Sequence, residues 1–413
     1  MPPAEDKGSD DFKFSLWAPP RGGYAACDTI VGSLIRKTPV VAPEAVITLS
    51  LTGRAKTRFT KTKAVYRNSR QLVSTGETVI FKGPIHLAAD SKEPLRWPFA
   101  VGIPLEPATS CKNDHSSEAS LLPVDQDHPG HHLLPGTFVS MDPSFAEPAR
   151  CYVEYYLTAR LHFRSSRRSE SHESIRRIIL RHPLEPLLKS PSLKVFETRR
   201  MIQSHRLMPE KGNAGLSFRQ KMQTFFESSK VPQFHYNIIL TVPEIIQLDN
   251  PEPFPLLLQI RPQIDRTSER IQDVMPDILA ADVRMILKEN TAVIAADIWD
   301  KIRSRSYWEP VELGLSHAFR QLESPIIIPT ATESKPVNLG KLFGLVLHQN
   351  GLSSHKRVLP SKAGIHPDFM TYNIRRTHEV GWQVTLLVAG QLQEAKFSSA
   401  VTILSGPSSG QST

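Results

Sequence analysis

The sequence predicts an all-β protein made of two β-sandwich domains. Short apolar runs recur along the chain, and in many of them apolar and polar residues alternate with the period of a half-buried strand. The 34 prolines are scattered through these runs, which disfavours long helices and suits strand ends and turns. At 413 residues the chain exceeds one ordinary sandwich, so two cores are expected.

The alternation is clearest in the stretch VITLSLTG (46–53), where hydroxyl residues separate Ile47, Leu49 and Leu51. This pattern places apolar side chains on one face of a strand and polar side chains on the other. Similar runs predict strands at 12–17, 29–35, 78–81, 97–103 and 152–163 and, in the second half, at 234–240, 256–260, 282–288, 342–347 and 382–388.

Breaks in this rhythm predict the domain organisation. The polar segment 1–11 and the Gly/Ser/Pro-rich tail 405–413 are expected to be disordered. The first domain is expected at 12–184, with a long polar surface loop at 106–136, and the second at 232–404. The segment 185–231 is interpreted as a linker with one short amphipathic helix at 216–226.

Composition limits the compartment and the partners. No signal segment or membrane-spanning run is recognisable, and three cysteines are too few for a disulfide framework, so a cytoplasmic protein is predicted. The formal net charge of +9 favours anionic partners such as acidic or phosphorylated tails and anionic lipid headgroups. Nucleic acid is not expected to bind, because no nucleic-acid-binding module is recognisable.

The common catalytic and phosphate-binding motifs are absent, so the chain is not expected to be an enzyme and no cofactor is predicted. One cluster, DHPGHH (127–132), contains His128, His131 and His132, which are residue types that bind zinc. We favour a polar loop without metal, because the Pro-Gly turn gives no shared face and a fourth ligand is not identifiable. The alternative is a ligand- or metal-binding sandwich, with hydrolytic chemistry at the His128–His132 loop.

The most pronounced charge feature is the stretch 53–76, which has seven cations and no acidic residue. On a strand, Arg54, Lys56 and Arg58 alternate with smaller or apolar residues and therefore project from one face, opposite Phe59. This basic segment, whose candidate anion-binding residues are Arg54, Lys56, Arg58, Lys61 and Lys63, is a candidate docking surface for phosphate or carboxylate groups. The competing interpretation is an edge strand that positive charge protects from aggregation.

Several ordered segments resemble the arrestin-like (α-arrestin) family. In the first half the resemblance rests on YAACDTIVG (24–32), VITLSLTGRAK (46–56), FKGPI (81–85), WPFAVGIP (97–104) and LPGTF (134–138) followed by YVEYYLTA (152–159). In the second half VPQF (231–234), PFPL (253–256) and DFMTYNIRR (368–376) are similar to the family's second domain. Ala26 and Cys27 replace the Pro-Gly of the family's opening turn.

The resemblance implies two arrestin-like, immunoglobulin-like sandwich domains and a non-enzymatic adaptor or scaffold. Such an adaptor binds the cytosolic tails of membrane proteins for trafficking, endocytosis or ubiquitin-dependent turnover, in the cytoplasm and at the plasma membrane or endosomes. The basic segment is then expected to contact cargo. The family recruits ubiquitin ligases through Pro-Pro-x-Tyr motifs, which this sequence lacks, so a link to the ligase machinery stays open.

Overall fold

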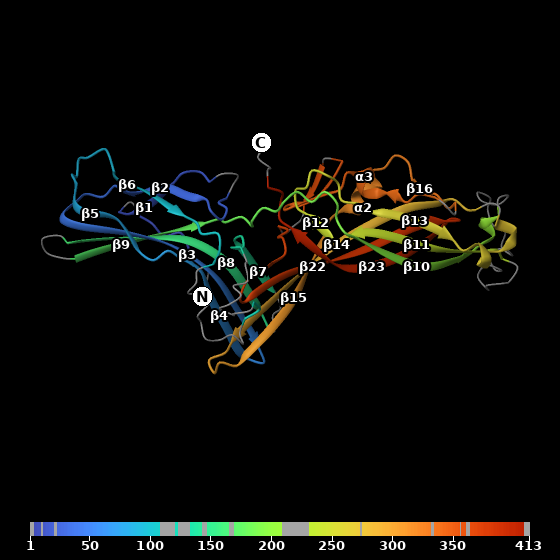
Figure 1. The fold of residues 1–413 in the computed structure, drawn as a ribbon, viewed down its shortest axis with the longest axis horizontal. Coiled ribbons are helices and arrows are strands. Elements are labelled where there is room, and N and C mark those ends of the chain that lie inside the picture. Colours follow the sequence, from blue (N-terminus) through green and yellow to red (C-terminus); the bar gives the residue numbers. More distant parts are fainter. Residues whose placement is uncertain are drawn as a thin grey trace. The chain divides into compact units, whose positions relative to one another are not determined.

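A computed structural model gives the structure of the chain. It describes residues 4–9, 11–19, 23–107, 120–122, 133–142, 147–164, 169–208, 231–272, 275–331, 334–355, 357–360 and 364–408. In these ranges the chain is built of β-strands with a few short helices, which confirms the all-β class (Figure 1). Within them, no helix has the length and apolar character needed to cross a bilayer.

The chain forms two compact units whose limits differ from the sequence-based boundaries. The first unit combines residues 1–183 with the segments 291–307 and 369–376, and the remaining residues form the second. The division therefore falls within three strands, namely β14 (Ile278–Ala296), β15 (Ile302–Glu312) and β22 (Ile374–Val388). Each half of such a strand alternates like an ordinary short strand, so the sequence pattern does not reveal that one strand serves two units.

The first unit contains the strands of the N-terminal half. They are β1 (Lys13–Leu16), β2 (Thr29–Arg36), β3 (Val40–Lys61), β4 (Ala64–Ser74), β5 (Thr78–Leu87), β6 (Leu95–Gly102), β7 (Phe138–Asp142), β8 (Ala149–Arg164) and β9 (Ser169–Ile178), joined by β21 (Phe369–Met370). One sheet has the order β1-β2-β6. In the other, β3 and β8 pair side by side, β5 and then β4 flank β3, and β9 and β7 flank β8.

The core of the first unit draws on both of its sheets. Ile30 and Leu34 of β2 belong to the same buried cluster as Ile47 and Leu161. Phe59 joins this cluster, fully buried and stacked on Tyr66 with the ring centroids 5.1 Å apart. The alternation read from the sequence thus separates core from surface in this unit. The complete two-sandwich arrangement stays a prediction.

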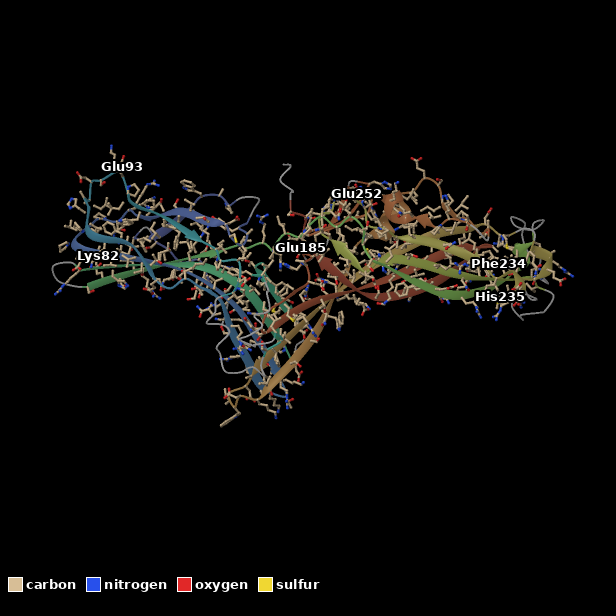
Figure 2. The ribbon with its side chains drawn as sticks, viewed as in Figure 1. Lys82, Glu93, Glu185, Phe234, His235 and Glu252 are labelled. Atoms are coloured by element: carbon tan, nitrogen blue, oxygen red, sulfur yellow. The ribbon has the colours of Figure 1, made fainter. Side chains whose placement is uncertain are left out.

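The second unit contains the remaining strands and most of the short helices. They are β10 (Leu193–Gln203), β11 (Gln233–Pro243), β12 (Ile245–Gln247), β13 (Leu257–Pro262), β16 (Ile326–Ile328), β17 (Val337–Asn338), β18 (Val346–His348), β19 (Gly351–Ser354), β20 (Arg357–Pro360) and β23 (Gln391–Leu404), with helices α2 (Leu315–Arg320) and α3 (Leu339–Phe343) and 3₁₀ turns η4 (His205–Leu207), η6 (Ile264–Arg266) and η7 (Glu269–Ile271). Alternation is visible on β11, where Phe234 is buried and its neighbour His235 is only half-buried (Figure 2).

The strand predicted at 342–347 is wrong, because its first residues belong to α3. Asn338 caps this helix by accepting a hydrogen bond from the backbone N–H of Lys341, and Gly344 ends it with a φ of 61°. A polar N-cap and a left-handed glycine at the C-terminal end are strong local helix signals. They outweigh the apolar Leu342 and Phe343, and the strand β18 begins only at Val346.

The predicted linker at 185–231 contains a strand, which corrects that interpretation. All eleven residues of β10 pair with β11 in antiparallel register. Lys194, Glu197 and Arg199 lie exposed on β10, so the strand is largely polar and its periodicity is weak in the sequence. The helix predicted at 216–226 lies outside the described residues.

Both predicted disordered ends contain ordered residues. Lys7 exchanges two backbone hydrogen bonds with Ile175, at 2.9 and 2.8 Å, and Asp6 accepts one from the Arg176 side chain. At the other end Glu185 and Ser408 are joined through a backbone hydrogen bond of 2.8 Å. Pairing with distant strands stabilises these segments, and local composition does not reveal it. Residues 409–413 lie outside the described part of the chain.

Candidate anion-binding groove

The strand β3 is internal to its sheet, so the edge-strand interpretation is wrong for the part of the basic segment that lies on β3. Its residues 52–61 pair with β4 on one side, and its residues 44–59 pair with β8 on the other. Arg54, Lys56 and Arg58 lie on the accessible face, whereas Phe59 is buried. The predicted division of β3 into two faces is therefore confirmed. A row of cations on an internal strand does not protect an edge.

Three arginines line up across three neighbouring strands. Arg58 on β3 lies directly opposite Arg67 on β4 and directly opposite Arg150 on β8. Directly opposed residues of an antiparallel pair share a face with their Cβ atoms roughly 5 Å apart, and like charges there are destabilising. In the next row, Lys56 lies between Ser69 and Tyr152.

These rows form the floor of a cavity of about 620 Å³ on the accessible face of the first unit, which we call the basic groove. The described lining residues include four cations and no carboxylate. They are Lys56, Thr57, Arg58, Thr60, Arg67, Asn68, Ser69, Met141, Pro148, Ala149, Arg150 and Tyr152. Guanidinium groups bind phosphate and carboxylate oxygens with two parallel hydrogen bonds, and the neighbouring hydroxyls add further donors. The lining of the groove thus has the charge and the donor groups that suit an anion.

The surroundings of Lys56 disfavour the charged form of its side chain. Burial lowers the pKa of its ammonium group, the Arg54 charge lowers it further, and only Glu154 acts in the opposite direction. A bound anion beside Lys56 would favour its charged form. Met141 lines the groove opposite Arg150 and accepts a hydrogen bond of 3.3 Å from the Arg150 guanidinium.

Arg54 has a different role from its neighbours on β3. Its Nε atom donates a hydrogen bond of 2.5 Å to Glu154, whose side chain is only 3% exposed. The guanidinium carbon also lies 5.0 Å from the centre of the Tyr156 ring. The backbone N–H of Ala4 donates to the second carboxylate oxygen of Glu154. Arg54 is therefore part of a partly buried ion pair, and it does not line the groove.

The last two candidates, Lys61 and Lys63, lie at the turn between β3 and β4. Both are exposed, and Thr62 and Lys63 adopt φ values of 50° and 66°. Of the five residues proposed from the sequence, the structure thus brings Lys56 and Arg58 together in the basic groove. Lys61 and Lys63 are not among its lining residues, and Arg54 is paired with Glu154.

Sequence reasoning missed Arg67 and Arg150 as groove residues. Arg67 belongs to the same acid-free stretch, and its place opposite Arg58 requires a tight β3–β4 hairpin that the sequence did not suggest. Arg150 lies more than ninety positions from Arg58, and only the β3–β8 register brings the two together. No local signal marks such a pairing.

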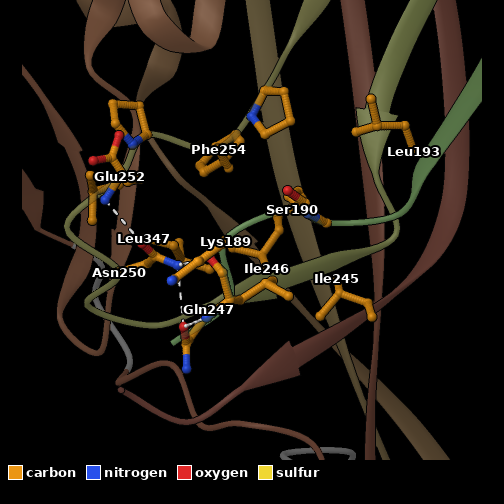
Figure 3. A pocket seen from close by; sticks show the side chains of 15 residues that line it. Lys189, Ser190, Leu193, Ile245, Ile246, Gln247, Asn250, Glu252, Phe254 and Leu347 are labelled. Atoms are coloured by element: carbon orange, nitrogen blue, oxygen red, sulfur yellow. Dashed lines mark hydrogen bonds between the residues drawn. The ribbon is translucent and has the colours of Figure 1, made fainter. Parts of the chain in front are cut away.

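A second cavity, of about 470 Å³, lies in the second unit beside β12 (Figure 3). Two of its polar side chains form hydrogen bonds with the backbone of the chain. Gln247 accepts a hydrogen bond from the backbone N–H of Leu188 and donates one to the Pro186 carbonyl, and Asn250 donates to the Leu188 carbonyl. These bonds fix the segment that enters the second unit. Lys189, Ser190 and Glu252 also line this cavity.

The histidine cluster at 127–132, on which the alternative function depends, lies outside the described residues. No protein-family model matches the chain, and no curated protein matches its sequence.

Proposed function

We propose that this chain is a non-enzymatic cytoplasmic adaptor that binds acidic or phosphorylated segments of partner proteins in the basic groove. The cytosolic tails of membrane proteins are the partners that the resemblance to arrestin-like proteins suggests. Delivery of these proteins to trafficking, endocytosis or turnover at the plasma membrane or endosomes is the corresponding role.

One observation carries the proposal, namely the row of Arg67, Arg58 and Arg150 on three paired strands. Such a row costs stability in the absence of an anion, and neither edge protection nor a described carboxylate in the lining accounts for it. Residues that cost stability yet persist on a rigid scaffold are typical of binding sites.

Binding in this groove needs no chemical step. Arginine forks hold phosphate or carboxylate groups while β3 and β8, paired along most of their lengths, keep the row rigid. The positive field steers an acidic segment toward the groove, and this contribution weakens as salt screens it.

Affinity capture from the native cell, with mass-spectrometric identification of the bound proteins, tests this role. The full chain is compared with the double variant Arg58→Glu/Arg67→Glu. The control is Lys194→Glu/Arg199→Glu, an equal charge change at exposed positions of β10. We expect membrane proteins with acidic or phosphorylated cytosolic segments to be captured by the full chain and the control and lost from the groove variant. Equal capture by all three proteins would contradict the proposal.

A further inference from the structure

The hairpin between β14 and β15 presents two large apolar side chains to solvent. Ile298 is 87% exposed and Trp299 is 82% exposed. Two adjacent exposed apolar side chains at a loop tip are a candidate contact surface for another body. The basic groove does not include them.

The turn that carries this pair is rigid. One carboxylate oxygen of Asp297 accepts hydrogen bonds from the backbone N–H groups of Trp299, at 2.8 Å, and Lys301, at 3.0 Å. The backbone N–H of Asp297 donates to the Lys301 carbonyl, and Asp300 adopts a φ of 55°. These hydrogen bonds fix the backbone of the turn, and the side chains of Ile298 and Trp299 are exposed on it.

A second hairpin turn lies at the same end of the first unit. Glu147 accepts hydrogen bonds from the backbone N–H of Thr62, in the β3–β4 turn, and from the Arg305 side chain on β15. Ala296 pairs with Arg67, so the chain after β14 continues along β4 toward that turn. Both turns lie at the lower end of the β4 and β15 ribbons in Figure 1.

Exposed cations lie on the same two turns as the apolar pair. Four exposed positive side chains come from the two turns and the start of β15, namely Lys61, Lys63, Lys301 and Arg303. Asp297 and Asp300 are the acidic residues of the β14–β15 turn, and the Asp297 carboxylate already accepts two backbone hydrogen bonds. Arg305 and the carboxylates of Glu147 and Asp142 meet beside the same turns, so these described groups comprise five cations and four carboxylates.

We propose that this end of the first unit, the hairpin tip (Lys61, Lys63, Ile298, Trp299, Lys301 and Arg303), docks on an anionic lipid bilayer. Tryptophan favours the boundary between headgroups and acyl chains, where its ring is apolar and its N–H stays wet. The surrounding ammonium and guanidinium groups match anionic headgroups. Ile298 and Trp299 enter the interface, and the cations hold the tip at the surface.

Sedimentation with vesicles tests this docking. The full chain is mixed at physiological salt with vesicles of phosphatidylcholine alone or with about one third phosphatidylserine, which supplies the anionic surface. We expect binding to the anionic vesicles, and partitioning about tenfold weaker or more for Ile298→Ser/Trp299→Ser, because the buried apolar area is lost. Trp17→Ser, which removes another exposed tryptophan, is the control and binds like the full chain.

Two further variants locate the contact. Lipids with brominated chains should quench part of the tryptophan fluorescence of the full chain, and Trp299→Phe should lose that part while still binding. Arg58→Glu/Arg67→Glu should retain most of the vesicle binding. Ile298→Ser/Trp299→Ser should retain peptide binding in the groove. The groove proposal and the membrane proposal can therefore be refuted independently. Equal vesicle binding by the full chain and Ile298→Ser/Trp299→Ser, or no binding to anionic vesicles, overturns the membrane proposal.

Discussion

Arg58 and Arg67 face each other across the β3–β4 ladder, each with a positive charge and each exposed. Replacing Arg58 by Gln removes the repulsion toward both of its arginine neighbours. We therefore expect the free energy of unfolding of Arg58→Gln to rise by roughly 0.2–1 kcal/mol at low salt. Thermal or urea unfolding of the two proteins measures the difference, which should shrink as salt increases.

A loss of stability in Arg58→Gln at low salt would mean that Arg58 has a structural partner and that the row is no strained binding site. Arg67→Gln is the matched second variant and is expected to change stability in the same direction.

Replacing Arg54, unlike replacing Arg58, should lower the free energy of unfolding. Arg54→Ala leaves the carboxylate of Glu154, which is almost fully buried, without its closest cation. We expect a loss of about 2–4 kcal/mol in the free energy of unfolding, because an uncompensated buried charge is costly. Lys61→Ala, at an exposed turn position, is the control and should stay within about 0.5 kcal/mol. Similar stability for both variants would refute the role of Arg54 as the partner of the buried Glu154.

Phe59 tests the assignment of the two faces of β3. Its ring is fully buried and stacked on Tyr66. Phe59→Ala should lower the free energy of unfolding by about 3–5 kcal/mol, since it removes a large core side chain and leaves a cavity. Urea unfolding gives the value, and a change below about 1 kcal/mol would show that this face is not the core face.

The buried His378 gives the second unit a pH-dependent contribution to stability. Burial by itself lowers the pKa of its imidazole, but the hydrogen bond of 2.5 Å to Asp368 and the nearby Glu289 carboxylate outweigh burial and raise it. A raised pKa in the folded state means that protonation of His378 favours folding. This stabilisation is fully present below the unfolded-state pKa of about 6.5 and is lost as pH rises through the folded-state value.

We accordingly expect the melting temperature to fall as pH rises through the region just above about 6.5. His378→Gln should be less stable than the full chain at pH about 6 and should show a flatter profile above it. Melting curves over this pH range measure both effects. A profile with the same slope in His378→Gln and the full chain would contradict the assignment.

Local signals in the sequence predicted the fold class and many strands, since Ile47, Leu49 and Leu51 alternate as the strand β3 requires. Pairing between distant residues was not predictable. Arg67 and Arg150, which lie opposite Arg58, belong to β4 and β8. The registers of these two strands against β3 depend on the whole sheet. For the same reason Glu154, one hundred positions from Arg54, was not recognised as its partner.

Charge alone pointed to the strand β3, whose Lys56 and Arg58 line the basic groove, but the sequence did not separate the candidate residues by role. Arg54, Lys56 and Lys61 look alike in the acid-free stretch. In the structure they lie in an ion pair, in the basic groove and at a turn, respectively. Only burial and register distinguish these environments.

Direct titration of a phosphopeptide tests the central claim most closely. A fluorescent acidic peptide with two phosphoserines is added to the full chain, to Arg58→Glu/Arg67→Glu and to the control Lys194→Glu/Arg199→Glu, and Kd is measured by anisotropy at low and physiological salt. We expect the groove variant to bind at least about a hundredfold more weakly, which corresponds to about 1.4 kcal/mol for each lost charged contact. The control should bind like the full chain, and salt should weaken both. Equal Kd values for the folded groove variant and the full chain would contradict the claim that the row of Arg67, Arg58 and Arg150 is the anion-binding site.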